Sequence, residues 1–319
     1  MGGISGQGTN YNLPNFVGDI FQITPSDTPF LSSIGRLTGG ERANATLFQW
    51  QAYDLRTASQ NTRVEGAAAP TAEARIRTNI SNVVQIHQEA IDIAYSKIAA
   101  VGQYSGLNIA GSNPVADEVA FQVEAMLKQI ARDIEVSFIS GSYQLPVDNT
   151  TPRKTRGILE AIATNVVNAS SATLTEKMVH DLLKSVYDNG GIMEQDSAVI
   201  MVNSTQLLWL NKIFIKDNNY RETDRNIGGV AVKVIYTPFG TLNVMLNRHM
   251  PAAQIAVVSL EQCAPVFLEV PGKGFLFVEP LAKTGASERS QIYGEVGLKY
   301  GNEKSHGKII NLSTVAPGS

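Results

Sequence analysis

The chain has 319 residues, of which 43% are hydrophobic and 17% charged, and its formal net charge is −3. This length and composition exclude an intrinsically disordered protein and allow a substantial core, in one large domain or two smaller ones. The slight excess of acidic residues argues against a protein that grips nucleic acid, because such a protein needs a basic surface to displace counterions.

The single cysteine, Cys263, excludes an intrachain disulfide framework and fits synthesis in a reducing compartment. The first basic residue is Arg36, and no charged region followed by an apolar stretch precedes it, so no signal peptide is predicted. No apolar run approaches the roughly 18–20 residues needed to cross a bilayer. We therefore expect a protein made in the cytosol and not inserted in a membrane.

The first 45 residues cannot form a core of their own. Residues 1–12 are rich in Gly, Ser and Asn. A short helix is predicted at 27–31, with a capping residue before Pro29 and an end near Gly35. Residues 1–45 are either a disordered tail or an arm that becomes ordered only against a neighbouring subunit.

Residues 46–95 predict a long two-stranded hairpin. Phe48, Trp50 and Ala52 alternate with more polar residues, and a Gly/Ala/Pro-rich stretch follows at 64–74. Such a hairpin has too little apolar surface to be stable alone in water. No helical pattern adjoins it, so we expect another chain to support it. The second strand places these residues on one face: Ile76, Thr78, Ile80, Val84 and Ile86.

The first 96 residues contain six arginines, at positions 36, 42, 56, 63, 75 and 77, and no lysine. The planar guanidinium group forms bidentate contacts with carboxylates, and such contacts are common at subunit interfaces. For each arginine taken separately, ordinary solvated charge is the alternative interpretation.

Residues 113–140 predict the clearest helix. Asn113 can cap it, Pro114 occupies its first turn, and Gly141 ends it. At 1.5 Å per residue the helix would be about 40 Å long, which suits a rigid spine packed against a sheet. Its acidic residues fit a solvated face. Its apolar residues recur at steps of three and four: Val119, Val123, Met126, Leu127, Ile130, Ile134 and Phe138.

From about residue 173 the pattern predicts a compact α+β region. Thr173 and Glu176 form a capping box for a helix through Tyr187, and a shorter helix at 205–214 carries Trp209. The residues at 237–240 have the chemistry of a hairpin turn. Strands are predicted at 197–202, 230–236, 241–246, 255–260, 266–270 and 292–300.

No catalytic or metal-binding motif is recognisable. The histidines at 87, 180, 249 and 306 lack metal-ligand spacing. Cys263 has no adjacent histidine or basic residue, so a buried inert thiol is predicted. Gly272-Lys273-Gly274 lacks the spacing and the following helix of a phosphate loop. We expect no catalytic residue, no metal and no cofactor; a hydrolase whose catalytic groups converge only in space remains the enzyme hypothesis.

Several segments resemble the SU-ten-like major capsid family of tailed bacteriophages, whose members have the Hong Kong 97 capsid fold. These segments span nearly the whole chain in the order of the family. They are TPFLSSIG at 28–35, FQWQ at 48–51, TRGIL at 155–159, FGTL at 239–242, NRHMP at 247–251, LAKTG at 281–285 and NEKSHGK at 302–308.

The resemblance implies an α+β Hong Kong 97-type capsid fold with an N-terminal arm, an extended β-hairpin loop, a long spine helix and an axial domain. The implied boundaries are 1–45 for the arm, 46–95 for the extended loop, 96–172 for the peripheral domain with the spine helix at 113–141, 173–262 for the axial domain, and 263–319 for the return to the peripheral domain. With the arginine pattern, it predicts intersubunit contacts at Phe30, Arg36, Trp50, Arg56, Arg63, Arg75 and Arg77.

The implied function is that of a major capsid protein, which self-assembles into the icosahedral head shell around double-stranded DNA. The implied location is the virion, after assembly in the host cytoplasm. Implied partners are copies of the chain in hexamers and pentamers, with portal, scaffolding and decoration proteins and no membrane. The packaged DNA would be enclosed without sequence-specific binding, which suits the mildly acidic charge. The alternative is an encapsulin-like compartment shell, which encloses an enzyme.

Two features depart from the type member of this fold. No long helical scaffolding segment precedes the arm, so we expect a separate scaffolding protein or none. The extended loop also has no lysine, so we expect none of the Lys–Asn cross-links of that type member. The shell would then depend on non-covalent contacts or on a decoration protein.

Overall fold

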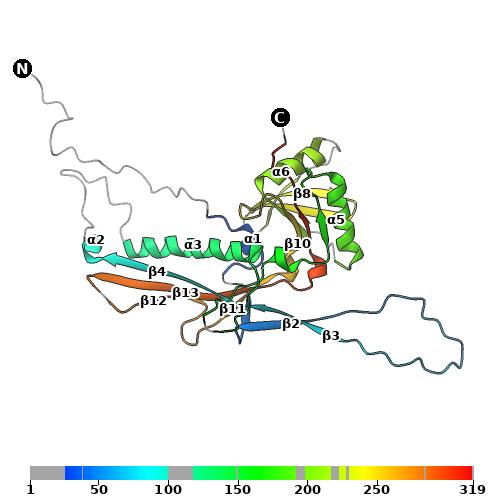
Figure 1. Ribbon diagram of the computed structural model, residues 1–319, viewed down its shortest axis with the longest axis horizontal. Coiled ribbons are helices and arrows are strands. Elements are labelled where there is room, and N and C mark those ends of the chain that lie inside the picture. The colour runs from blue at the N-terminus through cyan, green and yellow to red at the C-terminus, as the bar shows by residue number, and fades with distance from the viewer. Residues whose placement is uncertain are drawn as a thin grey trace, which may run out of the picture.

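The computed structural model describes residues 26–37, 39–99, 118–148, 150–191, 198–216, 223–227, 230–283 and 285–317. They form an elongated body with a compact lobe towards one end and a thin hairpin that projects beyond the body (Figure 1). In the body, a long helix lies along a sheet of long strands, and the lobe contains a second sheet flanked by helices. The architecture is therefore α+β, as predicted.

The body is built on a five-stranded sheet whose central strand is β13 (Ser287–Lys299). The whole length of β4 (Gln85–Ala94) pairs antiparallel with one edge of β13. β12 (Leu276–Pro280) and β11 (Ala264–Leu268) pair with successive parts of the other edge, and β1 (Glu41–Ala43) extends β11 in parallel. β13 begins before the predicted strand. Its first residues were not predicted because they are polar and carry no apolar signal.

The spine helix α3 (Glu118–Ser140) packs against β4 and β13. The predicted capping residues Asn113 and Pro114 lie outside the described residues. The core-facing residues of the C-terminal half of the helix are buried, and the apolar residues of its first half are only partly covered. The short helix α2 (Tyr95–Ala99) follows β4 at the end of the body where α3 begins. The fully buried apolar side chains of α3 are Ile130, Ile134, Phe138 and Ile139.

The lobe contains a seven-stranded sheet in the order β5-β14-β10-β6-β9-β8-β7. β6 is buried on both faces, which explains its continuous apolar sequence. Val199 and Met201 contribute to the core that contains α3, whereas Ile200 faces the second core under the lobe helices. The strands are β5 (Val166–Asn168), β6 (Ala198–Val202), β7 (Thr223–Ile227), β8 (Val230–Thr237), β9 (Gly240–Leu246), β10 (Ile255–Ser259) and β14 (Gly307–Ile310).

The helix α5 (Glu176–Asp188) begins later than its predicted cap. The capping box at Thr173 and Glu176 is wrong, because Thr175 is the N-cap and its hydroxyl accepts a bond from the Met178 backbone N–H at 3.3 Å. Leu174 and Val179 are buried in the same core, which fixes the start of the helix between them. The remaining helical segments are α4 (Ile158–Ala161), α6 (Ser204–Asn211) with a π-helical turn at Lys212–Lys216, and 3-10 turns at Leu260–Gln262 and Glu303–Ser305.

The chain returns to the lobe after β13. β14 pairs with β10 and β5, so residues 307–310 do not belong with the five-stranded sheet, contrary to the expected return of 263–319 to the peripheral domain. A Cβ atom at Gly307 would lie 2.8 Å from Leu182 and Val186 of α5. Glycine at this position therefore lets the helix pack directly on the strand.

The projecting hairpin consists of β2 (Leu47–Tyr53) and β3 (Arg77–Val83), paired antiparallel from Leu47–Val83 to Tyr53–Arg77. The predicted single strand through Ile86 is wrong. Val84 is fully buried between β3 and β4, and the chain changes its pairing partner there from β2 to β13. The alternation inverts across this break, so Ile86 is exposed and His87 is buried.

Candidate assembly interface

The root of the hairpin is held by its own chain. The indole N–H of Trp50 donates to the Gly301 carbonyl at 2.7 Å, and its ring meets Tyr300 edge-on at 4.9 Å. The buried amide of Asn82 donates to the Leu298 carbonyl at 2.7 Å. The expectation that another chain must support the hairpin is therefore wrong for the paired part of β2 and β3.

Beyond this root, residues 54–76 have no helix or strand, and every one of them is exposed. Figure 1 shows this segment reaching well beyond the body. Large apolar side chains lie along it and at its base: Leu55 is 70% exposed, Val64 81%, Ile76 81% and Tyr53 68%. A segment that offers this much apolar surface and has no support from its own core needs a partner to become ordered.

Four of the predicted interface arginines lie on this hairpin, and all four are exposed. Three of them make local contacts: Arg56 donates to the Ser59 hydroxyl at 2.7 Å, Arg75 pairs with Glu73 at 3.1 Å, and Arg77 donates to Gln51 across the strands at 3.1 Å. Such exposed contacts are weak, so these guanidinium groups can exchange them for carboxylates of a neighbour. The four are Arg56, Arg63, Arg75 and Arg77.

Phe30 and Arg36 lie elsewhere, and Trp50 lies at the root of the hairpin. Phe30 has no exposed surface, because α1 (Pro29–Ser33) packs into the core beside α3. Trp50 faces its own chain at the hairpin root, as described above. Arg36 is exposed in the turn after α1, with a φ of 60°, and its backbone N–H donates to the Leu31 carbonyl. The structure thus places five of the seven predicted residues on the hairpin, and the four arginines among them are exposed.

The helix of the arm segment is anchored by Glu135 of the spine helix. Thr28, the residue before α1, makes no side-chain capping bond. Instead, the backbone N–H groups of Phe30 and Leu31 donate to the two carboxylate oxygens of Glu135 at 2.9 and 2.7 Å. Asn247, which follows β9, donates to the same carboxylate at 2.5 Å. One side chain therefore joins the arm, the spine and the lobe.

Sequence reasoning missed Glu135 because it assigned the acidic residues of the helix to a solvated face. Glu135 is fully buried. Burial raises the pKa of its carboxyl group, and the three donated hydrogen bonds oppose that shift. The sequence spacing could have indicated that Glu135 is buried. Glu135 lies three residues before the core residue Phe138, and therefore on the apolar face of the helix.

Cys263, His306 and Lys273 each lie in surroundings that indicate a structural role. Cys263 is buried, as predicted, and burial raises the pKa of its thiol. His306 is held between the Ser259 N–H and the Tyr300 carbonyl, and burial lowers the pKa of its ring. Lys273 of the Gly-Lys-Gly segment pairs with Glu279 at 2.5 Å. Among the described residues, no group of three His, Cys, Asp or Glu side chains could hold a metal ion, and no helix could span a membrane.

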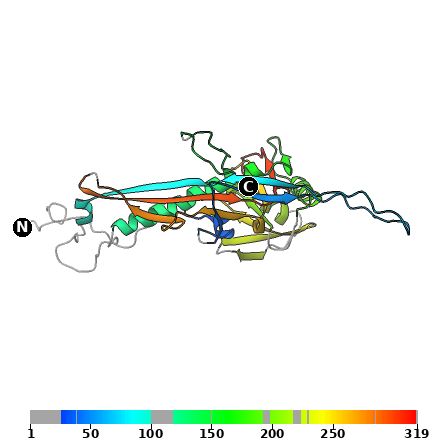
Figure 2. The same cartoon turned by 90° about the horizontal axis from the view of Figure 1, so that it is seen from below.

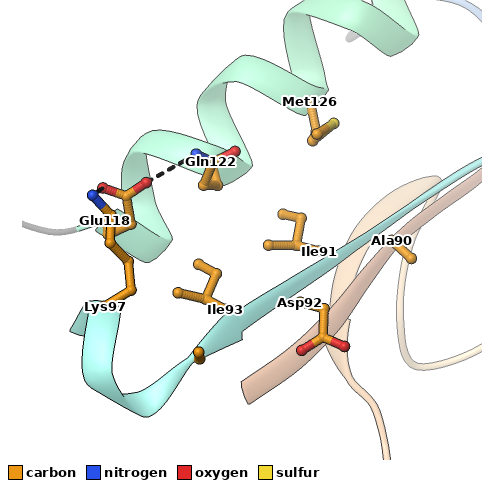
Figure 3. Close-up of a pocket in the computed structure, with 9 residues that line it drawn as sticks. Ala90, Ile91, Asp92, Ile93, Lys97, Glu118, Gln122 and Met126 are labelled. Atoms are coloured by element: carbon orange, nitrogen blue, oxygen red, sulfur yellow. Dashed lines mark hydrogen bonds and ion pairs between the residues drawn. The ribbon is translucent and has the colours of Figure 1, made fainter. Parts of the chain in front are cut away.

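A groove of about 370 Å³ lies between β4 and the first turns of α3 (Figure 3). Its charged groups satisfy one another: Lys97 lies 3.8 Å from the Glu118 carboxylate, which also accepts a bond from Gln122 at 2.9 Å. This arrangement offers no activated nucleophile or base. The groove is lined by Ala90, Ile91, Asp92, Ile93, Ala94, Lys97, Glu118, Gln122 and Met126.

The spine helix on a long-stranded sheet, the second sheet in a lobe and the projecting hairpin together define the Hong Kong 97-type capsid fold. The chain superimposes on the capsid protein of cyanophage A-1(L) with a TM-score of 0.66 at 12% identity, covering 94% of this chain and 97% of that one. It superimposes on the encapsulin complex of Synechococcus elongatus with a TM-score of 0.64 at 12% identity, covering 97% and 95%. These likenesses establish the fold.

The family follows from the sequence match. The model of the SU10 major capsid protein matches residues 3–313, so the chain belongs to the SU10 major capsid protein family. The chain is also 24% identical to the major capsid protein of Escherichia phage Phieco32, over 94% of each protein. The family resemblance predicted from the sequence segments is confirmed.

Proposed function

We propose that this chain is the major capsid protein of a tailed bacteriophage and self-assembles into the icosahedral head shell that encloses the double-stranded DNA genome. The role is structural, with no catalytic step. Two observations support the proposal: the family match over residues 3–313 and the wholly exposed segment 54–76. Among the structural observations, the exposed segment supports the proposal most directly, since a protein that acted alone would have no use for such a segment.

The proposed mechanism is the packing of identical wedge-shaped subunits around local five- and six-fold axes through heterologous interfaces that close into a shell. The hairpin lies over an adjacent subunit, where its apolar residues become buried and its arginines meet carboxylates. Overlaps of this kind bury well above roughly 2,000 Å² in obligate assemblies. In these terms, residues 1–45 are the arm, 46–95 the extended loop, 96–172 the peripheral domain and 173–262 the axial domain.

The proposed partners follow from the same role. Copies of the chain form hexamers and pentamers in the cytoplasm of the host. Portal, scaffolding and decoration proteins complete the particle, and the DNA is enclosed without sequence-specific contacts. The net charge of −3 favours such loose enclosure, because a basic inner wall would bind the genome tightly.

An encapsulin-like compartment shell is the second candidate, favoured by the TM-score of 0.64 to an encapsulin. The family match and the Phieco32 relative both favour the phage capsid over it. The content of particles from the natural source separates the two. Nuclease-protected double-stranded DNA of uniform length supports the head shell, and an enclosed enzyme without DNA supports the compartment.

Electron microscopy of the recombinant chain after size exclusion tests shell formation itself. Closed shells, tubes, or rings of five and six subunits are expected. The same experiment is run with the scaffolding candidate encoded beside the gene. A monomer or a uniform small oligomer in both experiments would overturn the proposal.

A further inference from the structure

The β4 edge of the five-stranded sheet has no partner strand among the described residues. Within the described part of the chain, β4 pairs only with β13, and it lies along the margin of the sheet in Figure 2. The edge strand of a sheet presents backbone N–H and C=O groups that can pair with a strand of another chain.

The free edge of β4 lacks several of the devices by which soluble proteins block edge pairing, although it contains Glu89 and Asp92. The strand has ten residues, pairs with β13 without a bulge, and contains no lysine and no proline. The two other edge strands of the sheet differ: β1 has three residues, and β12 has five and ends in Pro280. Short strands and proline are devices that block edge pairing, so β4 is the edge left open to it.

The groove of Figure 3 follows this edge. Its wall includes consecutive residues from Ala90 to Ala94, which point to both faces of the sheet. Ile91 and Ile93 point towards α3, and Asp92 points away from it. The groove therefore borders consecutive residues of β4 on the side of α3, and the open edge itself follows from the strand order.

We propose that β4 pairs antiparallel with β4 of a second copy of the chain, across a two-fold axis perpendicular to the sheet. The inference rests on the proposed function and names one contact of the shell. Directly opposed residues of such a pair must point to the same face of the sheet. The two residue numbers of every opposed pair must therefore have an even sum, and the axis must pass beside a residue of β4.

The side chains select the residue on the axis. An axis at Glu89 would oppose two carboxylates, which is unfavourable. An axis at Ile91 would oppose Asp92 to Ala90. On the exposed face, an axis at Ala90 opposes Ile86 to Ala94 and Gln88 to Asp92, while on the other face it opposes Glu89 to Ile91 and His87 to Ile93.

The Ala90 register pairs residues 86–94 with themselves, which is as long a stretch as any two-fold register of this ten-residue strand allows. It covers the Ile86 side chain, which is 44% exposed in the single chain. A contact between two strands is smaller than the roughly 1,200 Å² of a stable isolated interface. We therefore expect it within assembled shells and not between free subunits in dilute solution.

The test traps the contact covalently in shells built from Ala90→Cys. Directly opposed residues of an antiparallel pair have Cα atoms about 4.5–5.5 Å apart, within the range of a disulfide. Gln88→Cys is the matched control on the same exposed face. In the proposed register its Cα lies about 13 Å from the Cα of the same residue in the second copy, beyond disulfide reach. Native Cys263 is buried and serves as the background.

After mild oxidation, non-reducing gels of Ala90→Cys shells should contain at least about tenfold more covalent dimer than the Gln88→Cys control. Shells without excess dimer, or with more dimer in the control, would overturn this inference while the proposed function stands. Failure of the unmodified chain to form shells would instead overturn the proposed function.

A charge-swap experiment covers the case in which the cysteine variant does not assemble. Ala90→Lys and Ala90→Glu each place like charges at the axis, so each variant alone should form few shells. Co-expression of the two should restore assembly through Lys–Glu pairs. Normal shells from either variant alone, or no rescue by co-expression, would overturn the proposed pairing.

Discussion

Replacing Glu135 by alanine should free the arm segment from the spine helix. The first N–H groups of any helix have no partner within it, and those of Phe30 and Leu31 are bound by the Glu135 carboxylate. Glu135→Ala leaves both amides, and the Asn247 side chain, without an acceptor in a buried setting. α1 then has only its apolar packing to hold it.

The expected size of the effect follows from these bonds. A hydrogen bond to a charged group contributes about 1.5–3 kcal/mol, so losing the two from α1 weakens its attachment by about 3–6 kcal/mol. Each 1.4 kcal/mol changes an opening equilibrium about tenfold. Hydrogen exchange at the Phe30 and Leu31 amides should therefore accelerate at least about 100-fold. Glu135→Gln keeps one acceptor oxygen and should have an intermediate effect.

Mass-spectrometric hydrogen exchange on the unassembled chain measures this change. Glu124→Ala is the control, because Glu124 lies on the same helix and is exposed beside Lys128. It should leave exchange at Phe30 and Leu31 unchanged. If exchange there rises less than about threefold in a folded Glu135→Ala protein, the carboxylate is not what holds α1.

Three further predictions concern the shell and its acid sensitivity. Deleting residues 58–74 keeps the β2–β3 ladder, which ends at Tyr53–Arg77, and should leave a folded chain that forms no stable shells; intact, equally heat-resistant particles by electron microscopy would contradict this. Shells should dissociate in SDS to a single band without proteolysis, because the extended loop has no lysine, and a ladder of linked subunits would refute that. Burial lowers the pKa of His306, and that of His87 to about 4. The unfolded chain therefore binds more protons, and stability should fall as pH drops below about 6.5. The slope should be shallower in His306→Gln by denaturant titration at pH 5–8, and an unchanged slope would rule out His306 as a source.

The parts of the fold with strong local patterns could be predicted from the sequence. The apolar stripe of α3, the continuous apolar run of β6 and the turn between β8 and β9 each reflect contacts with near neighbours in the chain or uniform burial. Their environments repeat at a fixed period, so the residue pattern carries the structure directly.

Features that depend on distant partners could not be predicted. The break at Val84 arises because the chain exchanges β2 for β13, a strand about 200 residues away in sequence. The spacing of Glu135 indicates the apolar face of α3, but its role as acceptor for α1 depends on a residue 105 positions away in the sequence. β14 is too short to carry a period of its own.

The same limit applies to the prediction of assembly contacts. Alternation predicts that a segment is a strand, but it does not identify the chain that supplies the partner. In the hairpin, the structure separates the two cases: Trp50 and Asn82 are bound by the chain itself, and residues 54–76 are not. In β4, one edge is satisfied by β13 and the other is open. These surfaces, which have no partner among the described residues, are where we propose that a second copy binds.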